Sequence, residues 1–339
     1  MYHMSKKTKE WKPKVGGLFS GVGGIELGLE KNGFNVVWAN EIDKNSCITY
    51  RENFTHTLYE EDIKKLRGND LESVDVLCGG FPCQPFSVAG YRKGFEDDRG
   101  NIFFEIIRLV EELKRKPTVL FLENVKNFKT HDKGKTFQTV INIIHELGYS
   151  VFFDVLNTSD YTPIPQNRER TFLVCFKDEY NWEFSGSNDS MSYEFSKLFP
   201  PKKVQNNRPI KDFLEKKEVP ENFYYRQDKY MYPELRKTMK SKDTLYQWRR
   251  QYVRENKNKK CPTLTANMGT GGHNVPLVVT DDGFRKLTPR ECFNFQGFPK
   301  SFKLPKDLAN SHLYKQSGNS VTVPMISVLA KKIRQVIRP

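Results

Sequence analysis

The chain has 339 residues and a formal net charge of +14, because 55 lysines and arginines outnumber 41 aspartates and glutamates. This length accommodates one large domain and a smaller one. The positive excess predicts a polyanionic partner, with a basic surface that has no specific partner as the alternative. It argues against a protein built around an acidic surface.

Targeting and metal signals are missing from the sequence. No apolar stretch approaches the ~18 residues of a membrane span, and no secretory signal is found, so a soluble cytosolic protein with reduced thiols is expected. The six cysteines form no C-x-x-C pair, and the six histidines show no metal-ligand spacing. No metal site is therefore predicted.

Short apolar runs alternate with helical patterns in the first half of the chain. Apolar residues at helical spacing predict helices over 102–113 and 137–147. Strands are predicted at 15–19, 36–40, 74–78, 119–122, 151–156 and 171–176. This βαβ succession predicts a doubly wound, Rossmann-like α/β sheet.

The pattern breaks near Asp178. We expect a basic leader over 1–13, a first domain over 14–177, a smaller irregular domain over 178–284, and a return segment over 285–339. The last segment begins with a helix over 285–299, continues through a small-residue turn at 317–321, and ends with an amphipathic helix that must pack against something.

Positive charge is concentrated in the smaller domain. Residues 226–260 contain 12 lysines and arginines against 4 acidic residues. The aromatic residues interleaved with these charges are Tyr230, Tyr232, Tyr246, Trp248 and Tyr252. Basic residues neutralise phosphates and aromatic rings pack on sugars or bases, so this region is a candidate nucleic-acid face, with a solvated basic face as the alternative.

A glycine-rich turn follows the first predicted strand. It reads Phe19-Ser20-Gly21-Val22-Gly23-Gly24, it precedes a helix, and Glu41 lies 20 residues beyond Gly21 at the end of the second strand. Such a turn exposes main-chain N–H groups at a helix N-terminus, and an acidic residue at this distance is suited to ribose hydroxyls. An ordinary βα turn followed by an exposed acid is the alternative.

The most distinctive stretch follows the strand at 74–78. Two glycines lead into a loop in which prolines flank Cys83 on both sides. A thiol displayed just past the carboxyl end of a strand lies where open α/β sheets place their ligands, although a buried loop cysteine fits as well. Glu123 closes a later strand, either solvated or beside the cysteine. Arg168 and Arg170 share one side if the backbone is extended, either in a site or in surface ion pairs.

Taken together, these stretches resemble the DNA (cytosine-5)-methyltransferases over about residues 15 to 337. Glu61 is a departure, since relatives commonly have glycine before the position of Asp62. The matching blocks, in the family's order, are Phe19-Ser20-Gly21-Val22-Gly23-Gly24, Glu41 to Asp43, Gly80-Phe81-Pro82-Cys83-Gln84-Pro85-Phe86-Ser87, Asp97-Asp98-Arg99-Gly100, Glu123-Asn124-Val125, Gln166-Asn167-Arg168-Glu169-Arg170, Leu287 to Pro299 and Gly318-Asn319-Ser320-Val321.

The resemblance implies an S-adenosylmethionine-dependent methyltransferase sheet with a target-recognition domain, acting on cytosine flipped out of duplex DNA. It implies that Cys83 attacks cytosine C6, that Glu123 receives charge at N3, and that Arg168 orients the base. The cofactor-binding residues it implies are Phe19, Ser20, Gly21, Gly23, Glu41, Ile42, Asp62, Pro82, Asn319 and Ser320. The DNA-binding residues expected are Ser87, Arg99, Arg170, Arg249, Arg250, Thr263 and Thr265.

The resemblance also implies a monomer, paired in function with a restriction endonuclease. The main alternative is a transfer-RNA methyltransferase of the same family, whose Cys-Phe-Thr signature is not found, since Cys175-Phe176 precedes Lys177. A non-catalytic DNA-binding relative would lack the nucleophile or the acid. A nicotinamide dehydrogenase would explain only the glycine turn.

Overall fold

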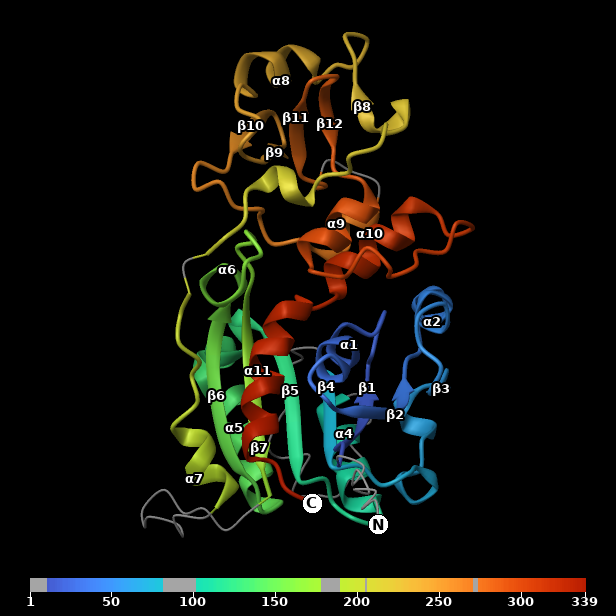
Figure 1. Cartoon of the computed structure of the whole chain (residues 1–339), viewed down its shortest axis with the longest axis vertical. Coiled ribbons are helices and arrows are strands. Elements are labelled where there is room, and N and C mark those ends of the chain that lie inside the picture. Colours follow the sequence, from blue (N-terminus) through green and yellow to red (C-terminus); the bar gives the residue numbers. More distant parts are fainter. Residues whose placement is uncertain (1–10, 82–101, 178–189, 205, 271–273) are drawn as a thin grey trace, which may run out of the picture.

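The computed structural model describes residues 11–81, 102–177, 190–204, 206–270 and 274–339. Figure 1 shows a large sheet with helices around it in the lower half of the view and a smaller sheet above it. Helices α9 (Pro289–Phe295) and α10 (Asn310–Asn319) lie between the two sheets.

The large sheet has the order β3-β2-β1-β4-β5-β7-β6. Strands β1 to β5 pair in parallel, and β7 runs antiparallel to both β5 and β6. The strands are β1 (Lys14–Leu18), β2 (Asn35–Asn40), β3 (Thr57–Tyr59), β4 (Val76–Gly80), β5 (Val119–Val125), β6 (Ser150–Asn157) and β7 (Glu169–Phe176). This order confirms the doubly wound α/β sheet that the sequence predicts.

Two apolar clusters cover the two faces of this sheet. Alternate strand residues face opposite sides, so Leu120 belongs to one cluster and Phe121 to the other. Helices α4 (Ile102–Glu112) and α5 (Lys135–Glu146) complete the first cluster, and α1 (Gly24–Glu30) and α11 (Val323–Val336) complete the second. The C-terminal helix thus packs on the first domain, as its amphipathic pattern predicts. Trp11, in the expected leader, also packs there.

The smaller sheet is antiparallel and has the order β10-β9-β11-β12-β8. Its strands, each two to four residues long, are β8 (Tyr224–Tyr225), β9 (Tyr246–Arg249), β10 (Tyr252–Glu255), β11 (Leu277–Thr280) and β12 (Gly283–Lys286). Such short strands leave little periodicity in the sequence, which is why this region seems irregular from the sequence alone. Tyr246 and Trp248 are buried in its core, so they cannot stack on nucleic acid as the sequence suggests.

The remaining helices connect or flank the two sheets. They are α2 (Lys44–Arg51), α6 (Thr158–Tyr161), α7 (Met191–Ser196) and α8 (Tyr232–Thr238). Two boundaries differ from expectation: the helix expected from Arg285 begins at Pro289 because Arg285 belongs to β12, and the turn expected at 317–321 is largely the last turn of α10. Every helix in the described ranges is too short or too polar to span a bilayer.

A buried ion pair joins the small sheet to α9. The guanidinium of Arg285 donates two hydrogen bonds of 2.7 Å to the carboxylate of Glu291, and both side chains are at most 2% exposed. Glu291 also accepts from the main-chain N–H of Thr288 in a capping box and from that of Glu215. One carboxylate therefore stabilises the start of α9 and fixes its junction with β12.

We expect Glu291→Ala to lower the free energy of unfolding by about 3–5 kcal/mol, because it leaves a buried guanidinium without its carboxylate. Urea denaturation followed by circular dichroism measures this change. Lys203→Ala is the control, since it removes a largely exposed ion pair with Asp160 and should cost less than about 1 kcal/mol. Equal losses in both variants would contradict this interpretation of the buried pair.

Candidate active site

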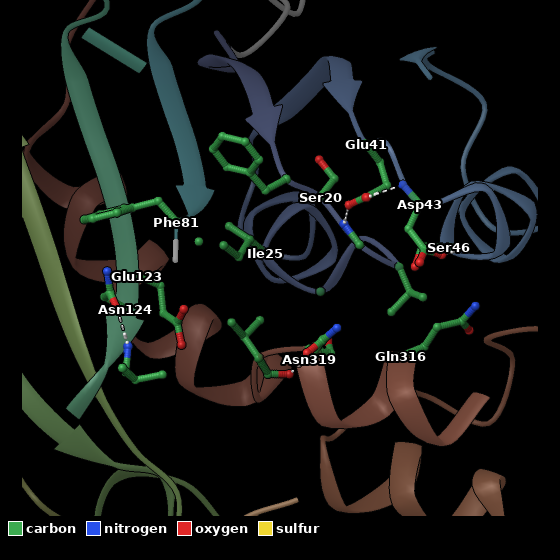
Figure 2. A pocket seen from close by; sticks show the side chains of 18 residues that line it. Ser20, Ile25, Glu41, Asp43, Ser46, Phe81, Glu123, Asn124, Gln316 and Asn319 are labelled. Carbon is green, nitrogen blue, oxygen red and sulfur yellow. Dashed lines mark hydrogen bonds between the residues drawn. The ribbon is translucent and has the colours of Figure 1, made fainter. Parts of the chain in front are cut away.

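A cavity of about 320 Å³ lies at the carboxyl ends of β1, β4 and β5. Figure 2 shows Glu41, Asp43 and Ser46 on one side of it, Glu123 and Asn124 across from them, and Gln316 and Asn319 below. The residues that line it are Phe19, Ser20, Gly21, Val22, Gly24, Ile25, Glu41, Asp43, Ser46, Gly80, Phe81, Glu123, Asn124, Val125, Gln316, Asn319, Ser320 and Val321.

Glu41 organises the glycine-rich turn. Its carboxylate accepts hydrogen bonds from the main-chain N–H groups of Gly21 at 2.7 Å, Ile42 at 2.8 Å and Asp43 at 2.7 Å. The turn is conformationally unusual, because Phe19 has a φ of 53°, a left-handed value that is rare for an aromatic residue and is found mainly at functional sites. The second strand and the turn are thus held together by one carboxylate at the cavity wall.

A third part of the cavity wall comes from the C-terminal part of the chain. Gln316 donates to the main-chain oxygen of Asn45 and accepts from the hydroxyl of Thr49, each at 2.9 Å. Lys315 and Asp43 form an ion pair at 2.9 Å. These contacts join α10 to α2, so the cavity is closed by segments about 270 residues apart in sequence.

Glu123 lies inside β5, opposite Gly80 in the parallel pairing of β4 with β5. A Cβ atom at Gly80 would lie 3.1 Å from Oε2 of Glu123, so glycine gives the carboxyl group its space. Nε of Arg170 lies 3.0 Å from Oε1 of Glu123 in an ion pair that is mostly shielded from solvent. Burial raises the pKa of Glu123, while Arg170 and Arg168 act in the opposite direction.

Arg168 points elsewhere. Its guanidinium donates to the main-chain oxygens of Leu264, Gly318 and Ser320. The two arginines do not share one side because β7 begins only at Glu169, and the chain turns at Gln166, whose oxygen accepts from the N–H of Arg168. The structure therefore pairs Glu123 with Arg170, which the resemblance places among the DNA-binding residues, and bonds Arg168 to main-chain oxygens.

The described cysteines are poor nucleophiles. All five are buried free thiols, and burial raises the pKa of each, to about 11 for Cys47. They are Cys47, Cys78, Cys175, Cys261 and Cys292. A thiol must ionise to attack carbon or bind metal, and nowhere in the described chain do three or more His, Cys, Asp or Glu side chains gather in a way that could hold a metal ion.

Comparison with known proteins gives this arrangement a family. A sequence model of the C-5 cytosine-specific DNA methylases matches residues 14–335. The chain belongs to this family.

Curated relatives are similar over almost their whole length. The chain is 50% identical over 324 residues to the Type II methyltransferase M.Bsp6I of Bacillus sp. (strain RFL6), covering 94% of this chain and 98% of that protein. It is 38% identical over 335 residues to the Type II methyltransferase M.HhaI of Haemophilus parahaemolyticus, covering 93% and 92%.

Solved structures support the fold. The Dnmt2 methyltransferase of S. pombe superposes with a TM-score of 0.71 at 18% identity, over 96% of this chain and 99% of that one. The methyltransferase EhMeth of Entamoeba histolytica gives a TM-score of 0.70 at 17% identity, over 97% and 100%. At these identities the likeness concerns architecture.

The protein is a DNA cytosine-5 methyltransferase, and this family uses S-adenosylmethionine as methyl donor. The cavity fits such a ligand, because its volume lies in the usual range for small-molecule sites. In addition, Nδ2 of Asn124, a residue on its wall, is a buried polar atom with no hydrogen-bond partner among the described residues. Unpartnered polar groups in a wall are costly unless a ligand satisfies them.

The other expected residues of this methyltransferase are distributed as follows. Ser20, Gly21, Phe19, Glu41, Asn319 and Ser320 line the cavity, whereas Gly23, Ile42 and Asp62 do not. Ile42 is 62% exposed, and Asp62 accepts from the N–H of Lys64 at the start of a short helical turn.

Pro82, Cys83, Ser87 and Arg99 lie outside the described residues. Arg249 and Arg250 are exposed at the tip of the β9–β10 hairpin. On the chain that follows this hairpin, the hydroxyl of Thr263 donates to the main-chain oxygen of Asn167, and the main chain of Thr265 lies against Gly318 of α10.

Several lining residues were not anticipated. Ser46 and Gln316 come from α2 and α10, whose sequences have weak apolar periodicity, so neither helix was predicted. Asn124 directly follows Glu123, and a polar residue at the carboxyl end of a predicted strand is a signal that could have identified it. Val22, Gly24 and Ile25 continue the glycine-rich turn, and their place in the wall follows from the start of α1.

We expect Glu41→Gln to weaken binding of S-adenosylhomocysteine roughly 10- to 100-fold, since an amide accepts through one oxygen only and loses a charge-assisted bond worth about 1.5–3 kcal/mol. Isothermal titration calorimetry measures this loss. Glu52→Gln, an exposed change just after α2, should leave affinity unchanged. Affinity retained in Glu41→Gln would show that the carboxylate does not organise the pocket.

Proposed function

We propose that this enzyme methylates C5 of one cytosine in a short duplex DNA sequence, with Cys83 as nucleophile, Glu123 as acid and Arg170 as the arginine nearest the base. The observation that carries the assignment is the position of Glu123. Its carboxyl group lies in the cavity wall, where it pairs with Arg170 and lies opposite Gly80. Gly80 precedes Cys83 by only three residues. The short covalent link from Gly80 supports a thiol and an acid acting on one base.

The chemistry requires these groups because cytosine C5 is too weak a nucleophile by itself. In the proposed sequence, the Cys83 thiolate forms a bond to C6 and pushes electrons toward N3, where protonated Glu123 donates a proton. C5 then becomes nucleophilic. Bound S-adenosylmethionine supplies an electrophilic methyl group. A base removes the C5 proton, N3 returns its proton to Glu123, and the thiolate leaves as the ring regains its double bond.

Three features of the described chain support these roles. The raised pKa of Glu123 favours the protonated form that can donate at N3. The charges of Arg170 and Arg168 both act on the single carboxyl group of Glu123, which leaves positive charge near the site and suits negative charge on the ring. The five other cysteines are all buried with raised thiol pKa values, which leaves Cys83 as the candidate nucleophile.

We assign target recognition to the small sheet. Arg249 and Arg250 lie at the tip of an exposed hairpin, with Tyr252 beside them at 56% exposure. Cytosine has to leave the stack to reach the cavity, at a cost of a few kcal/mol, and phosphate contacts from this basic sheet would offset part of that cost. Tyr230, 73% exposed, is a second candidate for stacking.

We further propose that the enzyme is the modification partner of a restriction endonuclease, acting as a monomer on DNA in the bacterial cytosol. The support is the designation Type II methyltransferase shared by the curated relatives. The transfer-RNA alternative has less support, because Cys175-Phe176 is followed by Lys177 rather than by the threonine of that branch.

Duplex DNA in which 5-fluorocytosine replaces cytosine should trap the wild-type enzyme covalently, since fluorine cannot leave as a proton does. Denaturing gel electrophoresis in the presence of S-adenosylmethionine detects the adduct, and bisulfite sequencing of unmodified DNA maps the target. We expect no adduct with Cys83→Ala and an unchanged adduct with Cys47→Ala. An adduct that persists in Cys83→Ala would remove that residue from the role, and label in transfer RNA alone would favour the alternative substrate.

Arg170→Gln should move the alkaline limb of the pH–rate profile upward by about 1–3 units. Glu123 must be protonated to donate, activity is lost as pH rises through its pKa, and Arg170 holds that pKa down. Single-turnover methylation rates across the pH range test this shift, together with a lower maximal rate. Lys126→Gln removes an exposed cation paired with Glu169 and should leave the limb in place. A limb that stays fixed or moves downward in Arg170→Gln would exclude Glu123 as the donor.

A further inference from the structure

Arg168 is buried where three distant segments meet. It is 2% exposed, and its guanidinium donates to the oxygen of Leu264 at 2.7 Å, of Gly318 at 3.1 Å and of Ser320 at 2.6 Å. Leu264 belongs to the chain that leaves the small sheet, whereas Gly318 and Ser320 flank Asn319 in the cavity wall. One side chain therefore contacts both the recognition region and the cofactor pocket.

We propose that Arg168 is a positioning residue that couples DNA binding by the segment 263–265 to cofactor binding at Asn319 and Ser320. This inference rests on the proposed DNA substrate and on the expectation that Thr263 and Thr265 bind DNA, and it gives Arg168 a role separate from contact with the target base.

The segment and the wall touch through their main chains. A Cβ atom at Gly318 would lie 2.2 Å from the carbonyl carbon of Thr265 and 2.3 Å from its oxygen. Real Cβ atoms do not approach backbone so closely, so glycine is required and no side chain cushions the contact. A shift of Thr265 is therefore transmitted directly to the last turn of α10.

The same segment is also fixed to the loop that carries Arg168. The N–H of Cys261 donates to the oxygen of Pro165 at 2.6 Å, and the N–H of Asn167 donates to the oxygen of Cys261 at 2.8 Å. The segment 261–265 thus has two attachments, one to the 165–167 loop through its backbone and one to the cavity wall through Arg168 and Gly318.

The buried charge of Arg168 explains why the three segments bonded to it are expected to move together. Burial and the neighbouring Arg170 lower the pKa of Arg168 to about 9, so at neutral pH the guanidinium remains charged. A buried cation without a bonded carboxylate is stable only while dipoles surround it. Its Nε already has no partner among the described residues. Withdrawing one carbonyl would leave another donor unsatisfied, so the three segments are expected to move together.

Coupling of this kind is reciprocal, since any ligand that favours one arrangement of the segment also favours the matching wall. DNA that orders segment 263–265 should therefore tighten cofactor binding, and the cofactor should tighten DNA binding by the same factor. Coupling factors of about 5–150 are typical.

The test measures the dissociation constant of S-adenosylhomocysteine by equilibrium dialysis, with and without a saturating duplex that carries the mapped target sequence. We expect DNA to tighten binding at least about fivefold in the wild type. In Arg168→Lys, whose ammonium cannot reach all three carbonyls, the ratio should fall below about twofold. Gly318→Ala perturbs the same contact from the other side and should lower the ratio in the same way, even if Arg168→Lys folds poorly.

Arg290→Lys is the matched control. Arg290 also donates to a main-chain oxygen, but to that of Phe302 at 2.6 Å and not to one in segment 263–265, so the ratio should be retained. A ratio kept in Arg168→Lys and Gly318→Ala, or lost equally in Arg290→Lys, would overturn the proposal. Failure of the wild type to methylate any DNA would instead overturn the proposed function, and the methylation assay identifies that case before dialysis begins.

Discussion

The register between β4 and β5 is the constraint on which the site depends. Parallel pairing sets Gly80 opposite Glu123, so the chain that leads to Cys83 leaves the sheet beside the carboxyl group. A slip of one residue would turn Glu123 to the other face of the sheet. Apolar residues with almost no exposure fix this register, including Leu77 and Leu120 on one face and Phe121 on the other. The core therefore determines the chemistry through strand alignment.

Buried charges are balanced to different degrees at three places: the Arg285–Glu291 pair, the Arg170–Glu123 pair and Arg168. Arg285 and Glu291 neutralise one another and fix a junction. Arg170 only partly offsets the burial of Glu123, whose pKa stays raised, so the acid can remain protonated. Arg168 is bonded to backbone dipoles alone within the described chain. Since an uncompensated buried charge is expensive, the incompletely balanced charges coincide with the residues that we propose for catalysis and positioning.

Local signals in the sequence located much of the site. Glu41 directly follows β2 and Glu123 lies two residues before the end of β5, and the carboxyl ends of strands in a doubly wound sheet converge. The roles of Arg168 and Arg170 were not accessible in this way, because they depend on a turn fixed by Cys261, almost 100 residues later. Gln316 was missed for a similar reason, since α10 is stabilised by contacts with α2 and not by an apolar stripe of its own.

If the small sheet recognises the target as we propose, its attachments explain how that target could change without loss of catalysis. Arg168 bonds to the carbonyl oxygen of Leu264, and Gly318 contacts the main chain of Thr265, so neither contact depends on which side chains the segment carries. At the other connection, Glu291 caps α9 through main-chain N–H groups. Side chains facing DNA are thus free to vary while the backbone that supports them, and the cofactor wall beside it, stays in place.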